Sequence, residues 1–254
     1  MVDGQQAADG LLDSWELFAG AVDGAQLYDE APGVLGAVTA APVPEMNGVW
    51  LRSTRAEPRV VEEVLDRVAG SGLPHCLQSR PGADAGIAGL AAARGMTAAG
   101  EVPLMVRDGQ SAPRVDSPGL DLVQLAPGEV GQHADLVAAC FEMPVEVARA
   151  LLTERTLRVP GLRCYLGRVD AEPVVTGLGV VVGDAVAVFN IATLESHRRR
   201  GYGAAATARA VADGLAAGAT WALLQSSDIG VGVYERLGFR TVERWPLWVS
   251  ATAE

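Results

Sequence analysis

The stretch SHRRRGYGAAATARA, residues 196–210, places three arginines and two glycines between an apolar run and an alanine-rich segment. The apolar run, AVAVFNIATL at 185–194, is typical of a buried strand. Alanine is the strongest helix former, so the segment after the glycines predicts a long helix. We therefore expect this stretch to turn the chain from a strand into a helix.

The turn contains residue types that suit a phosphate group. The first N–H groups of a helix have no partner inside the helix, and the helix dipole favours an anion beside them. Gly201 and Gly203 permit tight backbone geometry and leave room for a ligand. Arg198, Arg199 and Arg200 can add charge-assisted contacts to the same oxygens. The turn predicts a site for the pyrophosphate of a cofactor, although such a run also suits an ordinary exposed helix start.

The rest of the second half predicts an alternation of strands and helices. A segment rich in Pro, Gly, Ser and Asp at 107–121 predicts a linker. From 119 to 254 the pattern predicts a strand, two helices, three strands, a helix, a strand, a helix and a last strand. Gly183-Asp184 is a hairpin signal within the three strands, which favours an antiparallel meander. Pro144 is well placed to begin the second helix.

An internal repeat links the two halves of the chain. Residues 72–106 align with residues 218–249 across one gap of four residues, and both segments predict a strand, a helix and a strand. The first copy has Ala91 where the second has Tyr234. The stretch LRSTRAEPRVVEEVLDRVAG at 51–70, which precedes the helix of the first copy, has no glycine pair. We therefore expect a cofactor site in the second half alone. The matched positions are Gln78-Ser79 with Gln225-Ser226, Gly95 with Gly238, and Pro103-Leu104 with Pro246-Leu247.

Two motifs of the second half resemble those of the GCN5-related N-acetyltransferase (GNAT) family. The family's acyl-CoA motif has Gln or Arg, two residues, Gly, one residue, then Gly or Ala, which the turn satisfies from Arg198 to Gly203. A later helix of the family usually carries Asn, a Tyr seven residues on, and then Gly-Phe. The stretch VYERLGF supplies Tyr234 and the Gly-Phe pair, and Ser227 occupies the usual Asn position. The resemblance covers residues 119–254.

The resemblance implies an α/β (α+β) fold of the acyl-CoA N-acyltransferase type, with a mixed, mostly antiparallel central sheet flanked by helices and two related domains. Residues 1–114 would form a degenerate GNAT-like domain without a cofactor motif, as in tandem members of the family. Residues 115–254 would form the GNAT acyltransferase domain. The implied activity is transfer of an acetyl group from acetyl-CoA, as co-substrate, to a primary amine of a small molecule or peptide in a ternary complex.

The resemblance also implies roles for individual residues. Tyr234 takes the place of the family's general acid, and a phenol pKa near about 10 suits an alkyl thiol leaving group. The family binds the oxyanion with a backbone N–H of the strand before the turn, which here falls at 191–193. The expected acyl-CoA-binding residues are Ile191, Ala192, Thr193, Arg198, Arg199, Arg200, Gly201, Tyr202, Gly203, Ala204 and Ser227.

The general base stays open at the level of the sequence. The strand VAVFNIATL lacks the Glu that some family members carry there, which leaves Glu142, Glu195, Asp228 or a chain of water molecules. A non-catalytic acyl-CoA-binding module is a further function class that fits the same motifs.

A nicotinamide-dependent oxidoreductase is the third function class. Gly201, Gly203 and Ala206 match the dinucleotide pattern GxGxxG/A. That pattern needs its first glycine near the strand end and an acidic residue after the next strand. Here the residues ESHRRR follow Leu194, and Gln225-Ser226 stand at the second place, which disfavours this class.

Composition limits the partners. The net charge of −11 argues against nucleic acid and against a membrane, and mildly favours a cationic amine. All 20 basic residues are arginine, which excludes a Walker-type lysine and a lysine Schiff base. The three cysteines and three histidines lack disulfide or metal-ligand spacing, so no metal site is expected. Without a signal-like N-terminus or a long apolar span, we expect a cytoplasmic protein, and a homodimer is left open.

Overall fold

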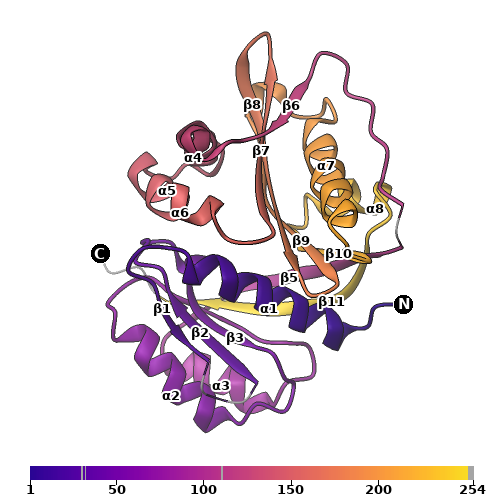
Figure 1. The fold of residues 1–254 in the computed structure, drawn as a ribbon. Helices are drawn as coiled ribbons and strands as arrows, with labels where there is room; N and C mark the ends of the chain where they lie inside the picture. Colours follow the sequence, from indigo (N-terminus) through magenta and orange to yellow (C-terminus); the bar gives the residue numbers. More distant parts are fainter. Residues whose placement is uncertain (30, 32, 110, 251–254) are drawn as a thin grey trace.

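The computed structural model describes residues 1–29, 31, 33–109 and 111–250, which form one sheet of eleven strands with helices on both faces (Figure 1). The mixed, mostly antiparallel sheet flanked by helices confirms the predicted fold class. The first half contains α1 (Gly4–Gly20), β1 (Gln26–Tyr28), β2 (Val34–Val38), β3 (Asn47–Leu51), α2 (Pro58–Ala69), β4 (Cys76–Gln78), α3 (Ala85–Ala93) and β5 (Thr97–Asp108). The second half contains β6 (Asp121–Gln124), α4 (Val130–Phe141), α5 (Val145–Leu151), α6 (Glu154–Leu157), β7 (Leu162–Val169), β8 (Glu172–Val182), β9 (Ala185–Thr193), α7 (Tyr202–Ala216), β10 (Trp221–Gln225), α8 (Val231–Arg236) and β11 (Arg240–Val249).

The order of elements in the second half matches the predicted order, with one short helix added. The region predicted as two helices is divided into α4, α5 and α6. Glu142 ends α4 in the left-handed region, with φ 54°, and Pro144 is the N-cap of α5. The antiparallel meander consists of β7, β8 and β9, and its second hairpin turns at Gly183-Asp184.

Helices cover both faces of the sheet, and α1 reaches across the two halves (Figure 1). Successive side chains of a strand point to opposite faces. In β10, Trp221 and Leu223 pack in the same cluster as Leu11 and Leu12 of α1. Ala222 and its alternate neighbours instead pack in the cluster that includes α7. Both faces of this strand are therefore buried.

The two halves meet at the centre of the sheet, where they exchange their last strands. The central order is β3-β4-β11-β5-β10-β9, so β11 of the second half pairs with β4 of the first, and β5 pairs with β10. The hydrogen bonds at this junction occur twice. Ser79 N–H donates to the carbonyl of Pro246 at 3.1 Å, and Ser226 N–H donates to that of Pro103 at 2.9 Å.

The junction relates the same residues that the internal repeat aligns. Gln225 Nε2 donates to Gln78 Oε1 at 2.8 Å, between two matched positions. Gly95 and Gly238, which follow matched helices, both have positive φ, 66° and 84°. The repeat predicts two similar units, whereas the exchange of strands joins them in one sheet. None of the described helices is long and apolar enough to cross a membrane.

Candidate active site

A gap opens between β9 and β10 beside the arginine-rich turn. In the described chain these parallel strands pair at Ala185, Val186 and Ala187 of β9, and their pairing ends there. Beyond that point β9 stays paired with β8 as far as Thr193, whereas β10 stays paired with β5 as far as Gln225. The strands diverge because each follows a different neighbour. Backbone groups on the two facing edges are left to meet a ligand.

A β-bulge in β9 directs backbone donors into this gap. Asn190 has φ 49°, and the register between β8 and β9 shifts at this point. Thr176 Oγ1 donates to the carbonyl of Asn190 at 2.7 Å, which holds the bulge. Leu194 N–H donates to a carbonyl of β8 at 3.0 Å. Because N–H groups alternate in direction along a strand, those of Ile191 and Thr193 face the gap.

Helix α7 begins at the gap, and no side chain caps its N-terminus. Its N-cap, Gly201, has φ 85°, and no side chain forms a capping hydrogen bond there. The N–H groups of residues 202–204 are therefore available to a ligand. A Cβ on Gly203 would lie 3.4 Å from Thr193 Oγ1 and 3.5 Å from Ile191 Cγ2. A larger side chain at Gly203 would fill the space between the helix and β9.

These elements border a cavity of about 920 Å³. Tyr234 lines it together with ten of the eleven residues expected to bind acyl-CoA. Arg200 does not line it, because its side chain turns back and Nη2 donates to the carbonyl of Ser196 at 3.4 Å. The ten are Ile191, Ala192, Thr193, Arg198, Arg199, Gly201, Tyr202, Gly203, Ala204 and Ser227.

The cavity wall is positively charged, although the chain has a net charge of −11. Four guanidinium groups line it, against one carboxylate, that of Asp116. Within the described residues, none of the four is in an ion pair. A wall of this kind favours a ligand with several negative charges. The four arginines are Arg114, Arg198, Arg199 and Arg236.

Tyr234 is the cavity residue with a strongly shifted pKa. Its ring contacts that of Phe239 edge to face, with 6.0 Å between centroids. Burial raises the pKa of Tyr234 to about 12, because the charged phenolate is disfavoured away from water. In the described part of the chain its hydroxyl has no protein partner, so it remains free to donate to a ligand.

The three carboxylates considered as a general base lie outside the cavity lining. Glu142 and Glu195 are exposed, at the end of α4 and in the turn before α7. Asp228 is exposed and forms an ion pair with Arg244 at 3.1 Å. The geometry gives none of these three the position of a base. Nor do the described residues contain a group of three or more His, Cys, Asp and Glu side chains that could hold a metal ion.

Two contributions to the cavity were missed from the sequence. Arg114, Val115 and Asp116 come from the segment interpreted as a linker, and Cys140 and Phe141 come from the end of α4. Burial raises the pKa of the Cys140 thiol, so the thiol stays protonated. The composition of the linker signals an irregular segment but not the surface that the segment covers. Arg236, in contrast, belongs to the VYERLGF motif, so the sequence did mark its position near the site.

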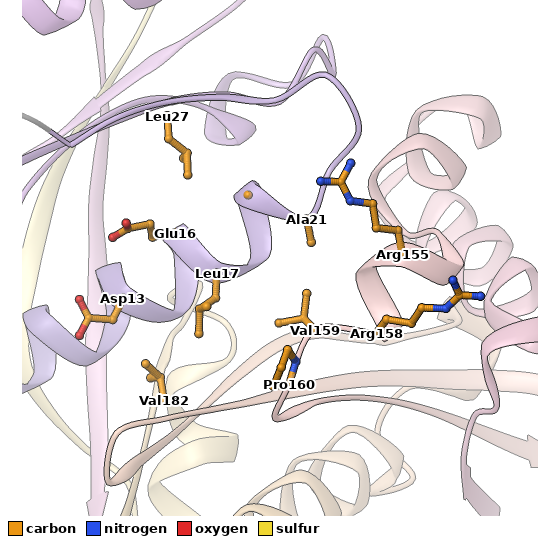
Figure 2. A pocket seen from close by; sticks show the side chains of 11 residues that line it. Asp13, Glu16, Leu17, Ala21, Leu27, Arg155, Arg158, Val159, Pro160 and Val182 are labelled. Atoms are coloured by element: carbon orange, nitrogen blue, oxygen red, sulfur yellow. The ribbon is translucent and has the colours of Figure 1, made fainter.

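A second cavity, of about 730 Å³, lies between α1 and the segment that joins α6 to β7 (Figure 2). Figure 2 shows Asp13 and Glu16 of α1 on one side and Arg155 and Arg158 on the other, with apolar side chains such as Val159 between them. Each charged side chain already has a partner, so this cavity lacks the surplus charge of the first. The ion pairs are Arg52–Asp13 at 2.5 Å, Arg52–Glu16 at 3.9 Å, Arg155–Asp23 at 2.5 Å and Arg158–Glu154 at 3.2 Å.

Solved structures share this fold over nearly the whole chain. A GCN5-related N-acetyltransferase from Kribbella flavida is 21% identical, has a TM-score of 0.73, and is matched over 100% of this chain and 97% of its own. A GCN5-related N-acetyltransferase from Sphaerobacter thermophilus is 13% identical, with a TM-score of 0.64 over 95% of this chain and 84% of its own. A tandem GNAT protein from the clavulanic acid biosynthesis pathway is 15% identical, with a TM-score of 0.57 over 99% and 97%. At these identities the likeness concerns the fold.

A family model adds evidence at the level of the sequence. The model of the acetyltransferase (GNAT) family matches residues 132–239, the segment that includes the arginine-rich turn and Tyr234. No protein with a curated description matches the sequence significantly. The family model and the shared fold confirm the resemblance inferred from the two motifs: residues 132–239 match the acetyltransferase (GNAT) family model, and the chain has the fold of solved GNAT structures.

Proposed function

We propose that this protein is an N-acetyltransferase that transfers an acetyl group from acetyl-CoA to a primary amine of a small molecule or peptide in a ternary complex. The observation that carries the proposal is the positively charged cavity beside the open N-terminus of α7, in a chain of net charge −11. Free N–H groups at a helix start and surplus arginine charge favour a nucleotide with several phosphates. The family of residues 132–239 adds acyl-CoA chemistry to this electrostatic argument.

The residues present fit the phosphates of acetyl-CoA. The N–H groups of residues 202–204 are open, and the missing side chain of Gly203 leaves the space that a Cβ would narrow. Arg198 and Arg199 line the same cavity and would add charge-assisted hydrogen bonds. Arg198 is oriented by its own backbone contact, since its Nε donates to the carbonyl of Thr193 at 3.3 Å. Acetyl-CoA would supply the acyl group in activated form, as a thioester.

Two groups of the chain would act on the reacting atoms. The N–H groups of Ile191 and Thr193 face the gap and would donate to the carbonyl oxygen as negative charge develops there. The hydroxyl of Tyr234 would donate its proton to the departing thiolate. With a pKa of about 12 this phenol is protonated at neutral pH, so it can act as an acid.

The acceptor amine needs another route for its proton. Glu142, Glu195 and Asp228 lie outside the cavity lining, so we propose that water molecules take the proton. The net acidity of the chain would favour the approach of a cationic amine by long-range steering. Deprotonation would then follow inside the ternary complex.

Binding provides the first test. Thermal unfolding is measured with acetyl-CoA, CoA and NADH in parallel, for the wild type and for Gly203→Trp. A ligand that binds the folded state alone adds about 2.7 kcal/mol of stability at a hundredfold excess over its Kd. A shift with acetyl-CoA that Gly203→Trp abolishes supports the proposal. A shift with NADH alone would favour an oxidoreductase, and no shift with any CoA species would contradict acyl transfer.

Turnover separates the proposal from a non-catalytic acyl-CoA-binding module. One observation favours that second candidate. The described cavity lining contains a single carboxylate, Asp116 of the linker, and none of the three carboxylates considered as a general base. Release of free CoA thiol is measured with acetyl-CoA and a panel of primary amines. Amine-dependent release supports the transferase. Binding without release across the panel would support the module.

A further inference from the structure

The linker between the two halves forms part of the cavity wall. Arg114, Val115 and Asp116 line the cavity on which the turn before α7 also opens. Val115 packs against the apolar cluster that contains Leu237 and Tyr234 of the α8 region. This contact fixes the linker beside the site. The linker therefore does more than connect β5 to β6.

The linker also lies directly beside the phosphate-binding turn. Ser117 Oγ is buried without a hydrogen-bond partner, 3.9 Å from the position that a Cβ on Gly201 would take. A smaller groove runs between the linker and α7, and Arg114 lines this groove together with Ala205 and Ala208. Arg114 consequently stands where this groove meets the main cavity.

Arg114 carries charge that no described residue neutralises. Its side chain is exposed and has no ion pair in the described part of the chain. Arg198 and Arg199 belong to the turn at the start of α7, where the pyrophosphate would lie. Arg236 stands on α8, two residues from Tyr234. Of the four cavity arginines, Arg114 is the one that lies outside both the turn and α8 and that also lines the groove along α7.

CoA carries a further phosphate on its ribose, at the end of the molecule that is remote from the thiol. We propose that Arg114 binds this ribose phosphate, so that the linker makes the second half prefer CoA to dephospho-CoA. The inference rests on the proposed function, because it takes CoA as the ligand of the cavity. It adds that the segment joining the two halves is a specificity element of the site.

The test compares two ligands that differ by this one phosphate. The Kd values of CoA and dephospho-CoA are measured by titration calorimetry for the wild type, Arg114→Gln and the control Arg55→Gln. Arg55 is exposed in the loop of the first half that corresponds to the arginine-rich turn, and its substitution changes the net charge equally. Thermal unfolding of each variant without ligand verifies that it folds.

We expect Arg114→Gln to raise the Kd of CoA about tenfold, which corresponds to the loss of one charged hydrogen bond, and to leave the Kd of dephospho-CoA unchanged. Arg55→Gln should leave both Kd values unchanged. Equal weakening of the two ligands by Arg114→Gln, or no weakening, would overturn the inference while CoA binding by the wild type still stood. Failure of the wild type to bind CoA at all would instead refute the proposed function and the inference with it.

Discussion

The turns that lead into α2 and α7 occupy matching places in the two halves but have opposite chemistry. Helix α2 begins with Pro58, which has no N–H, and its N-cap is the acidic Glu57. Helix α7 begins after Gly201 and three arginines, with open N–H groups. At α2 a phosphate would meet a proline without an N–H and a negative side chain. At α7 it would meet free N–H groups and positive charge. The fold supplies two helix starts, and the side chains make one of them suitable for an anion.

The interiors behind these turns differ in the same sense. Arg80, which the repeat aligns with Ser227, forms a buried ion pair with Glu243 at 2.5 Å, and the two side chains are 6% and 12% exposed. The residue that the repeat aligns with Glu243 is Gly100, where a Cβ would meet nothing within 4 Å. The position beside β4 is thus filled by Arg80 and by Glu243 of the exchanged strand β11, whereas the corresponding position of the second unit is open. If the first half binds no cofactor, as the repeat predicts, this position is free to contribute to stability.

The largest expected effect comes from breaking this pair. Glu243→Ala leaves Arg80 buried without its countercharge, and should lower the free energy of unfolding by about 3–5 kcal/mol. Urea denaturation measures the change. Arg244→Ala is the matched control, because its ion pair with Asp228 is exposed and should contribute less than about 1 kcal/mol. Similar losses in the two variants would mean that the buried pair stabilises the protein no more than an exposed one.

The next largest effect concerns Tyr234, whose counterpart in the first half is Ala91. Tyr234→Phe should lower kcat about 100-fold, because the thiolate loses its acid, and should leave the Kd of acetyl-CoA unchanged. The pKa of about 12 lies above the ordinary value, so the acid form persists as pH rises. The wild-type rate should therefore show no fall from this group near pH 10.

Steady-state kinetics across pH tests both statements. Tyr28→Phe, at a half-buried tyrosine of the first half, serves as the control and should leave kcat unchanged. An unchanged kcat in Tyr234→Phe would mean that Tyr234, like the buried Ala91, serves packing rather than catalysis. A fall of the wild-type rate centred near the ordinary phenol pKa would contradict the effect of burial.

Charge reversal in the turn tests whether the anion site depends on the lining arginines. Arg199→Glu gives the second half an acidic residue at its turn, as Glu57 does in the first half, and should weaken acetyl-CoA about 30-fold, or 2 kcal/mol. Arg200→Glu makes the same change of charge one residue away, but Arg200 does not line the cavity. Screening by salt should limit its effect to about threefold. Calorimetry that found equal losses would assign the site to net charge rather than to position.

The sequence predicts those features whose signals are local. Alternating apolar residues, hairpin glycines and helix formers give the order of elements in the second half, and the glycine pair marks the turn before α7. Arg200 was grouped with its neighbours because the run of arginines is uniform in sequence. In the structure Arg199 has φ 63°, and this left-handed residue helps to turn the chain so that adjacent side chains diverge.

Features that depend on distant contacts had no such signal. Leu104 pairs with Gln225 through the strand exchange, although a local pattern describes each strand by itself. Arg114 reaches the cavity because Val115 packs against residues of α8, more than a hundred positions away. Composition identifies a linker, but the surface that a linker covers is decided by tertiary packing.

The smallest expected effect tests where the two halves are still alike. Gly95 and Gly238 follow α3 and α8 with φ 66° and 84°, a region that costs an alanine about 1 kcal/mol. A Cβ on Gly95 would meet nothing within 4 Å, and one on Gly238 would lie 3.5 Å from Arg107 Nε, an ordinary contact. The conformational cost alone should therefore determine the stability of both variants, so Gly95→Ala and Gly238→Ala should each lower the free energy of unfolding by about 1 kcal/mol in urea denaturation.

Gly89→Ala, inside α3 with open space around it, is the control and should instead raise the free energy of unfolding by about 0.5–1 kcal/mol. A much larger loss at Gly238 than at Gly95 would mean that the helix-to-strand junction of the second half depends on its cavity, and that the two junctions share a backbone path without sharing its energetics.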